Sequence, residues 1–578
     1  MDPVDFFQEP QTIAQKQYEA LRMFFIENID AKTVAANFGY TYRGFTTIVS
    51  DFRKKLRDNK ANSLFFNELQ RGRKKSPESY QDIIINLRKK YYSVEDIKVV
   101  LDAKGLSVSE KTIYNIIRSK GFARLPRRQK LVKQQLEKTQ IAAEKSVSLS
   151  GEKESFKSTD AGILCLLPYI KQYGIDSIIE QSHYPGTKQI SKVSSILSFV
   201  ALKASNARRY TADDAWCMDR GLGLFAGLNV LPKAAWFSSY SHRVTRQMNL
   251  NFLKALHKKW LELGLLSDTV NLDFTTIPYW GDNEHLENNW SGKRTKSLAS
   301  MLAVLAQEPD SGIIDYGDTD VKHKNQSDVV LEFIDFYHSD PNSKIDLKYL
   351  VFDSKFTNYQ NLSKLDDNQI KFVTIRRRGK NIIENLESVP KNQWKKVRVE
   401  RAGNKKVALK VLDQTIFLKG YDKNIRQISI TGHGRIKPAT ILVNDFELPV
   451  EKVVRKYARR WIVEKSICEQ IDFFHLNSVS SSMVIKVDFD LTMSILTHNL
   501  FRLFALDTQR YKHLTDKKIY EKFLDNAADI HIDENQIQVN MKKKRNLPVI
   551  LEDLSDMTNH KYQWLNNCKL IISGATNS

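Results

Sequence analysis

The sequence predicts a multidomain protein of the α+β and α/β classes, with N-terminal helical units, a helical middle region and an α/β core interrupted by a β-rich insertion. Three observations support this prediction. The chain has 578 residues, which is too long for one hydrophobic core. Residues 1–128 carry apolar side chains at helical spacing, with capping residues between the runs. After residue 265, short apolar runs typical of strands alternate with helical segments, which indicates an α/β layer.

The first helical unit, residues 1–65, has the pattern of a helix-turn-helix. Ala35 and Gly39 have the spacing of a helix that packs against a tight turn. The helix after the turn would direct its apolar residues inward and present Tyr42 and Arg43 outward, as a DNA-recognition helix does. A plain helical bundle is the alternative interpretation of the same periodicity.

A second unit of this kind, residues 76–128, follows a basic tether. Ser93 with Asp96 predicts the cap of one helix, and Ser107 with Glu110 predicts the cap of the next. The outer face of that next helix and the basic arm after it supply further candidate DNA-binding residues, which are Lys111, Tyr114, Arg118, Arg124, Arg127 and Arg128. Two consecutive units favour DNA binding more strongly than one unit does.

The remaining boundaries follow from changes in composition and periodicity. Residues 129–158 are rich in Lys, Gln, Glu and Ser and predict a linker. The β-rich insertion is expected to hold several strands, two of them at 406–412 and 414–420. In chain order, the segments after the linker are a helical region (159–264), the first part of an RNase H-like core (265–390), the insertion (391–446), the second part of the core with a long helix (447–510) and a C-terminal region (511–578).

The chain is strongly basic, with a formal charge of +22 and a pI near 9.5. Residues 1–150 contain 28 Lys or Arg against 17 Asp or Glu, and residues 371–420 contain 14 against 4. Such a charge suits a polyanionic partner, either nucleic acid or an anionic membrane surface. Two separate basic regions, one of them beside the helix-turn-helix patterns, favour nucleic acid that is contacted at more than one point.

The cysteines and the apolar runs point to a cytoplasmic protein with no membrane partner. No C-x-x-C pair occurs, which argues against a zinc ribbon or a disulfide framework. No apolar run approaches the roughly 18–20 residues that span a bilayer. The acidic N-terminal segment lacks the apolar core of a signal peptide.

Two aspartates stand at the ends of strand-like runs. Asp273 ends an alternating run, in which it shares a face with Asn271 and Thr275. Asp353 follows the apolar run 349–352, at the carboxyl end of a buried strand, where open α/β sheets place their sites. An aspartate in such a position is more often a turn former or a helix cap, so each one alone indicates little.

Glu464 lies on the apolar stripe of the long helix predicted after residue 448. At 100° per residue its side chain falls about 20° from the line of Tyr457, inside the stripe rather than on the wet face. A carboxylate buried there needs a cation. That cation is either Arg460, one turn earlier, or a divalent metal shared with Asp273 and Asp353. Three carboxylates and water oxygens suit Mg²⁺ or Mn²⁺.

The order of these carboxylates, with the helix motif Tyr457-x2-Arg460-x3-Glu464, resembles the DDE transposases of bacterial insertion sequences. It is most similar to the cut-and-paste subgroup that carries a β-strand insertion and a Y-x2-R-x3-E signature. The spacings agree with that subgroup, at 80 residues from Asp273 to Asp353 and 111 from Asp353 to Glu464. The resemblance covers residues from about 160 to about 575.

The resemblance implies an RNase H-like core in which Asp273, Asp353 and Glu464 bind two Mg²⁺ or Mn²⁺ ions and DNA strands are cleaved and joined by in-line attack. Tyr457 and Arg460 would contact DNA phosphates beside the metals. The partners would be double-stranded DNA, namely the terminal inverted repeats of the element and its target, bound by a homodimer that pairs two ends in a bacterial, nucleoid-associated complex.

The sequence departs from the subgroup at one position and leaves two other functions open. The subgroup has a lysine seven residues after the Glu, where this chain has Ile471. A domesticated or inactive transposase acting as a DNA-binding regulator would keep the helix-turn-helix units without needing the carboxylates. A metal-dependent DNA nuclease on the same fold would need the carboxylates but would carry out no strand transfer.

Overall fold

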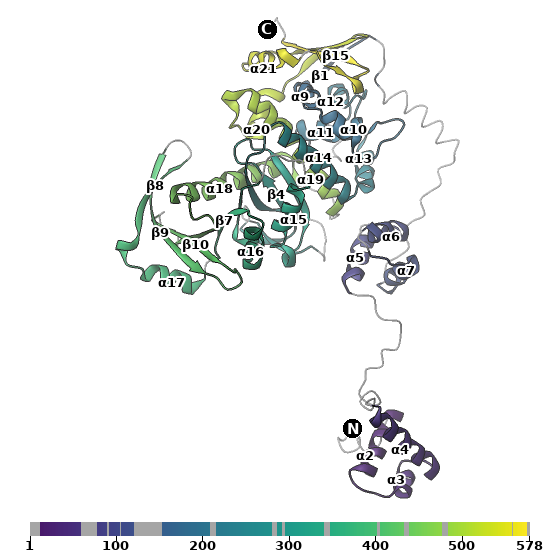
Figure 1. Cartoon of the computed structure of the whole chain (residues 1–578). Helices are drawn as coiled ribbons and strands as arrows, with labels where there is room; N and C mark the ends of the chain where they lie inside the picture. The colour runs from purple at the N-terminus through teal and green to yellow at the C-terminus, as the bar shows by residue number, and fades with distance from the viewer. Residues whose placement is uncertain are drawn as a thin grey trace, which may run out of the picture. The chain divides into compact units, whose positions relative to one another are not determined.

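The computed structural model contains two compact units, Met1–Arg127 and Arg128–Ser578 (Figure 1). Among the described residues, no helix is both long enough and apolar enough to span a bilayer. The described residues are 12–58, 78–89, 92–103, 106–120, 149, 153–208, 216–279, 286–291, 295–339, 347–377, 379–401, 405–432, 438–476, 484–557 and 559–574.

The first unit begins with three helices around a small apolar core that is centred on Phe45. The side chains of Asp30 and Thr41 accept hydrogen bonds from backbone N–H groups in the first turns of the second and third helices, and so fix where these helices begin. Gly39 between them has a φ of 60°, the left-handed conformation that the predicted tight turn requires. The helices are α2 (Ile13–Phe25), α3 (Ala31–Asn37) and α4 (Tyr42–Arg57).

Three further helices of the first unit enclose a separate core. Ser93 and Asp96 form the predicted reciprocal cap, because Ser93 Oγ accepts from the Asp96 N–H at 3.1 Å and the Asp96 carboxylate accepts from the Ser93 N–H at 3.0 Å. The predicted cap of the last helix by Ser107 and Glu110 is wrong. Glu110 is already the first helical residue, and Ser109 caps the helix instead. The helices are α5 (Glu78–Lys89), α6 (Val94–Ala103) and α7 (Glu110–Ser119).

The described part of the second unit contains a strand, β1 (Glu154–Ser158), where the sequence predicts the end of a linker. β1 pairs antiparallel with β12 (Ala528–Ile532). The linker prediction is therefore wrong for these residues, because the partner strand lies near the other end of the chain and leaves no local signal. Residues 121–148 and 150–152 lie outside the described residues.

The strands β1 and β12 belong to a five-stranded sheet in the order β1-β12-β13-β15-β14. No strands are predicted from the sequence in this C-terminal region. Its other elements are α20 (Asp516–Ile519), β13 (Gln536–Met541), α21 (Leu547–Leu554), β14 (Lys561–Tyr562) and β15 (Cys568–Gly574).

The predicted helical middle region packs around a later helix, α19 (Val484–Asp507), which is buried along most of its length (Figure 1). Asp488 of α19 accepts hydrogen bonds from Arg246 at 2.7 Å and from Asn249 at 2.6 Å, and this buried contact joins α19 to α14. The elements of the region are η2 (Ala161–Leu166), α9 (Leu167–Gln172), α10 (Ile175–Gln181), α11 (Lys192–Ala204), α12 (Arg220–Phe225), α13 (Ala234–Tyr240), η4 (Ser241–Arg243) and α14 (Arg246–Glu262).

A ten-stranded mixed sheet forms the centre of the second unit. Its order is β3-β4-β2-β6-β7-β11-β10-β9-β8, with β5 also paired to β4. The pairs β2–β6 and β6–β7 are parallel and the other pairs are antiparallel, as an α/β layer with an added β-rich segment requires. The strands are β2 (Thr269–Pro278), β3 (Asn288–Ser291), β4 (Lys296–Gln307), β5 (Ile314–Val321), β6 (Tyr349–Phe352), β7 (Lys371–Ile375), β8 (Lys395–Arg401), β9 (Lys405–Phe417), β10 (Asn424–Thr431) and β11 (Ala439–Val443). The helices between them are α15 (Val329–Tyr337), α16 (Tyr359–Asp367) and α17 (Lys380–Ser388).

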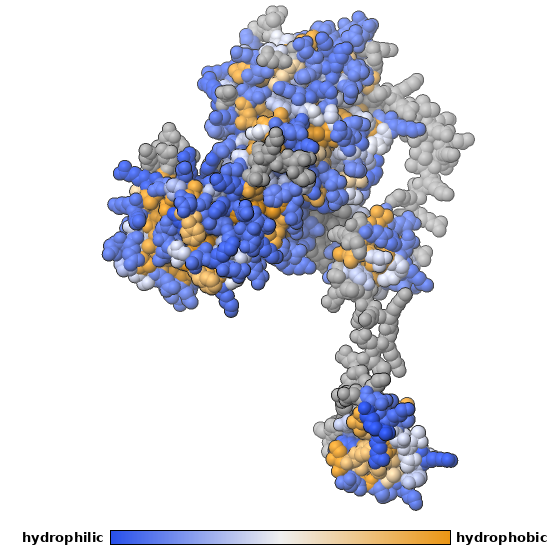
Figure 2. Space-filling view, viewed as in Figure 1, coloured by the Kyte–Doolittle hydropathy of each residue, from blue (hydrophilic) through white to orange (hydrophobic). Residues whose placement is uncertain are grey.

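The β-rich segment extends the core sheet, because β11 pairs with β7 from Ile441 opposite Ile375 to Val443 opposite Val373. The prediction of two strands at 406–412 and 414–420 is wrong, since residues 406–417 belong to the single strand β9 and residues 418–420 follow it as a turn. Asp413, which resembles a turn residue in the sequence, pairs with β10 across the sheet. On the face seen in Figure 2, hydrophilic residues form most of the surface of the second unit, with hydrophobic patches among them.

Arg426 of β10 fixes the approach to the long helix α18 (Val450–Phe473), which the sequence predicts from about Pro449. Its guanidinium pairs with the Asp413 carboxylate at 2.7 Å. It also donates to the carbonyl oxygens of three residues that lead into α18, which are Asp445, Phe446 and Leu448. The side chain is only 9% exposed, so these bonds are shielded from water.

We expect Arg426→Leu to lower the free energy of unfolding by about 2–4 kcal/mol, because it leaves a carboxylate and three carbonyl oxygens without their donor. Urea denaturation of the full chain measures this change. Lys423→Ala is the matched control, because it removes an exposed cation from Asp366 and Asp367 and is expected to cost much less than Arg426→Leu. Equal losses in the two variants would contradict the role of Arg426.

Candidate active site

Strand β2 (Thr269–Pro278) places Asp273 in the interior of the second unit. The prediction that Asp273 ends its strand is wrong, because β2 continues for five residues beyond it, paired with β4. The strand is buried at nearly every position, and Asp273 is 6% exposed. One carboxylate oxygen, Oδ1, accepts from the backbone N–H of Phe274 at 2.8 Å. Asn271, two residues earlier and therefore on the same face, is also buried, and its side-chain Nδ2 has no hydrogen-bond partner among the described residues. This part of the sheet is thus a polar surface inside the protein.

The register of β2 and β6 brings Asp353 beside Asp273. The two strands are parallel, with Leu272 opposite Phe352, so the next residue on each strand is an aspartate. Neighbouring strands lie about 4.8 Å apart, and residues in parallel register share a face of the sheet. The predicted juxtaposition of the two aspartates therefore follows from the backbone pairing alone.

The turn after Asp353 is held against β2. Asp353 precedes the short helix η7 (Ser354–Phe356), and its side chain makes no capping hydrogen bond there. The Phe356 ring stacks on the ring of Phe274 at a centroid distance of 3.8 Å and an angle of 8°. This stack joins the residue that follows Asp273 to the turn that follows Asp353. The Asp353 carboxylate itself takes no part in capping that turn.

Helix α18 brings Arg460 to Asp273. Arg460 Nη1 lies 2.8 Å from Asp273 Oδ2, and the two side chains are 6% and 8% exposed. The sequence left open an ion pair between Arg460 and Glu464 on the same helix. The described ion pair of Arg460 is with Asp273, across the interface between α18 and the sheet, and the side chain of Glu464 lies outside the described residues.

Tyr457 lies one turn before Arg460, whose guanidinium carbon is 5.4 Å from the centre of the Tyr457 ring. Burial raises the pKa of Tyr457 to about 12; Arg460 opposes this shift, and the negative charges of Asp353 and Asp273 add to it. The phenol is therefore neutral near neutral pH and can act as a hydrogen-bond donor beside both aspartates.

Glu464 lies in α18, one turn beyond Arg460, as the sequence predicts. Its side chain is outside the described residues, as are those of the other residues from 461 to 466. Ile471, which stands where the resembled subgroup has a lysine, is 7% exposed and packs in the main hydrophobic core. It therefore has a packing role in this chain.

The two adjacent aspartates fit a divalent cation. Their carboxylate oxygens are the ligands that Mg²⁺ and Mn²⁺ prefer, and two carboxylates side by side are stabilised by positive charge between them. Among the described residues no group of three His, Cys, Asp or Glu is close enough to hold a metal ion, and the side chain of Glu464 is not among them. Asp273, Asp353 and Glu464 are the residues that would hold the ion.

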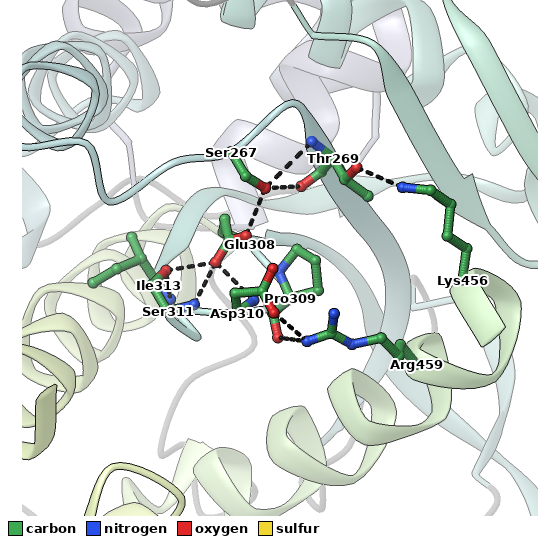
Figure 3. Close-up of polar contacts among 9 residues, drawn as sticks. All are labelled: Ser267, Thr269, Glu308, Pro309, Asp310, Ser311, Ile313, Lys456 and Arg459. Carbon is green, nitrogen blue, oxygen red and sulfur yellow. Dashed lines mark hydrogen bonds and ion pairs between the residues drawn. The ribbon is translucent and has the colours of Figure 1, made fainter. Parts of the chain in front are cut away.

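Three further cations, which no motif in the sequence indicated, lie on the elements that form this site. Arg377 follows β7, and its Nε donates to the Ser354 carbonyl oxygen at 3.1 Å, next to Asp353. Lys456 and Arg459 of α18 contact the start of β2 and the turn between β4 and β5 (Figure 3). The basic run around Arg377 was the available signal, but only the register of β6 and β7 places it beside the aspartate.

The candidate DNA-binding side chains of the first unit lie on the surface where they are described. Tyr42 is 54% exposed at the start of α4, and Arg43 beside it is also exposed. On α7, Lys111, Tyr114 and Arg118 are exposed. The arm residues Arg124, Arg127 and Arg128 lie outside the described residues.

Comparison with known proteins adds a family match to this geometry. Residues 267–500 match the model of a family described as the transposase DDE domain. The matched segment contains Asp273, Asp353 and Glu464, and the match supports a DDE transposase. No curated protein sequence matches the chain.

One solved structure that matches is a cryo-EM structure of a piggyBac transposase synaptic complex with hairpin DNA. The two chains are 11% identical, the match covers 64% of this chain and 82% of that chain, and the TM-score is 0.34. A similarity at this level carries no argument about fold or mechanism.

We expect Asp273→Ala to lower the free energy of unfolding by about 3–5 kcal/mol, because it takes the carboxylate away from a buried guanidinium. Asp353→Ala is expected to cost less than about 1 kcal/mol, since that side chain is half-buried and makes no capping bond. Urea denaturation of both variants checks the difference. A small, equal effect in the two would show that the Asp273–Arg460 pair is not structurally important.

We expect Tyr457 to stay un-ionised as the pH rises from 10 towards about 12. Its folded pKa is above its unfolded value, so its contribution to stability is complete below pH 10 and is lost as the pH rises through about 12. The ultraviolet absorbance of tyrosinate, measured as wild type minus Tyr457→Phe, should show no ionisation near pH 10. An ionisation step there would contradict the buried environment.

Proposed function

We propose that this protein is a cut-and-paste DNA transposase, which binds the terminal inverted repeats of its element and catalyses metal-dependent strand cleavage and strand transfer. The observation that carries the proposal is the pair Asp273 and Asp353, placed side by side by the register of β2 and β6 and faced by the helix that carries Glu464. The family match over residues 267–500 supports the same reaction class.

The strand order supports an RNase H-like core. With the four-residue β3 set aside, the strands in chain order are β2, β4, β5, β6 and β7, and their order in space is β5-β4-β2-β6-β7. Asp273 then lies on the first strand and Asp353 at the end of the fourth, with Glu464 on a later helix. This is the placement that the resemblance to DDE transposases implies.

The chain's own residues account for much of the chemistry that this reaction needs. Bound divalent ions would activate the attacking water or 3′-hydroxyl and stabilise the leaving oxygen. Arg460 holds Asp273 in place and contributes positive charge that favours a phosphate group. The neutral phenol of Tyr457 can donate a hydrogen bond to a phosphate oxygen, and Arg377 offers a further cation next to Asp353.

The DNA contacts are proposed on two parts of the chain. The helices α4 and α7 would enter DNA grooves as the second helices of two helix-turn-helix units, with Tyr42, Arg43, Lys111, Tyr114 and Arg118 on their exposed faces. The basic segment 371–420, which includes β8 and β9, would follow the DNA backbone near the cleavage point. A homodimer would bring two DNA ends together.

Other features of the proposal come from the resemblance. An origin in a bacterial insertion sequence is proposed from the Y-x2-R-x3-E signature. Because Ile471 is a buried apolar residue, the phosphate contact of the subgroup lysine is either absent from this chain or made by another residue.

The test is cleavage of duplex DNA that carries the inverted repeats flanking the gene. We expect cleavage at the repeat ends that requires Mg²⁺ or Mn²⁺, and a loss of at least about a thousandfold in Asp353→Asn with DNA affinity kept within about threefold. Asp353→Asn is preferred to Asp273→Ala because it leaves the Asp273–Arg460 pair intact. Cleavage by Asp353→Asn at the wild-type rate would refute the site assignment, and cleavage without joining to a target would favour a nuclease.

A further inference from the structure

The helix α18 carries Tyr457, Arg460 and Glu464, so its placement against the sheet sets the geometry of the candidate site. Two further residues of α18 also contact the sheet. Lys456 directly precedes Tyr457, and Arg459 directly precedes Arg460. Lys456 Nζ donates to Thr269 Oγ1 at 2.9 Å, at the first residue of β2. Residue 456 lies three residues before 459 and four before 460, so Lys456 neighbours both arginines on the helix surface, while Arg459 and Arg460 point about 100° apart.

Arg459 contacts the turn between β4 and β5. Its Nη2 donates to the Pro309 carbonyl oxygen at 3.0 Å and pairs with Asp310 Oδ1 at 2.5 Å (Figure 3). Both contacts come from one nitrogen of a planar guanidinium, so they fix its direction as well as its distance. The helix is thereby attached to the sheet at two places, the start of β2 and the β4–β5 turn.

The β4–β5 turn is built rigidly around Glu308. This residue is 1% exposed, and its carboxylate accepts from Ser267 Oγ at 2.6 Å and from the Asp310 N–H at 2.8 Å (Figure 3). It also accepts from both the backbone N–H and the hydroxyl of Ser311. Protein donors therefore satisfy the buried Glu308 carboxylate. These hydrogen bonds fix the backbone of the turn, and the turn holds Asp310 in one orientation toward Arg459.

The far end of α18 is held as well. Lys203 of α11 is buried, and its Nζ donates to the Phe474 carbonyl oxygen at 3.0 Å and to Asp490 at 2.8 Å. His475 contacts Asn206 through its ring Nε2 at 2.7 Å. The part of the helix that contains Glu464 therefore lies between two anchored ends.

We infer that Arg459, through its contact with the turn built around Glu308, is a positioning residue that sets the tilt of α18 and so the place of Glu464. This inference rests on the proposed function. Glu464 lies about 6 Å along the helix axis beyond Arg460, so a tilt of about 10° about Arg460 moves it by about 1 Å. A displacement of that size costs catalysis about a hundredfold when a reacting geometry is involved. Lys456, about 6 Å before Arg460 along the axis, opposes that tilt through β2, and Arg459 opposes it through its sideways contact with the β4–β5 turn. The contacts at the far end of α18 limit the tilt but do not connect the helix to the strand that carries Asp273.

The test uses the full-length protein and the variant Arg459→Ala. We expect the affinity for Mn²⁺, measured without DNA by electron paramagnetic resonance of the free ion, to fall by about tenfold, as is typical when a residue that supports metal ligands is removed. The kcat for cleavage should fall about tenfold or more, with KM for DNA within about threefold. The thermal midpoint should change little, because the Arg459–Asp310 pair is largely exposed.

Two further variants make the result specific. Arg455→Ala removes the same charge from an exposed position on the same helix, and it should keep wild-type Mn²⁺ affinity. Arg459→Lys, which preserves the charge and the reach to Asp310, should recover Mn²⁺ affinity to within about threefold of wild type.

The outcomes separate the inference from the proposed function. If Arg459→Ala and Arg455→Ala have the same Mn²⁺ affinity and the same kcat, Arg459 does not position the site. If Arg459→Ala loses Mn²⁺ binding only together with its thermal midpoint, its role is general stability and the inference also fails. If wild type binds Mn²⁺ and Arg459→Ala weakens that binding, the inference stands even where no DNA is cleaved, and only the proposed function fails.

Discussion

The buried ion pair between Asp273 and Arg460 is the contact on which the rest of the candidate site depends. Both charges are shielded from water, so neither is stable in the interior without the other. Asp273 belongs to the sheet and Arg460 to α18, so the pair fixes the helix against the strand at one point. The orientation of Tyr457 and the place of α18 beside Asp353 depend on that point together with the contacts of Lys456 and Arg459.

Positive side chains lie next to the two aspartates of the candidate site. Two adjacent carboxylates attract a metal ion, but alone they would also repel a DNA phosphate. Arg460 and Arg377 place positive charge next to Asp273 and Asp353 respectively, and the basic strands β8 and β9 continue it along the sheet. A polyanion can therefore approach the carboxylates without meeting a net negative surface. The +22 charge of the chain matters most through this local placement.

The order of helices and strands in the core was predictable because it depends on local periodicity. The strand that ends at Asp353 and the long helix with Glu464 are examples. Pairing between distant segments was not predictable, as β1 shows by joining a strand near the other end of the chain. The same limit applies to the site: the motif indicated Arg460, but its partnership with Asp273 depends on helix-to-sheet packing. The continuity of β9 through Asp413 depends likewise on Arg426, a residue of the next strand.

The union of the β-rich segment with the core sheet sets the distance from Asp273 to the basic edge strand β8, and so the length of duplex that the proposed DNA contacts would span. From β2, which carries Asp273, to the edge strand β8 the sheet advances by six strand spacings, at most about 29 Å. That is the length of about eight or nine base pairs of duplex. Because every step is a ladder of backbone hydrogen bonds, the sheet keeps a fixed distance between Asp273 and its outermost basic strand.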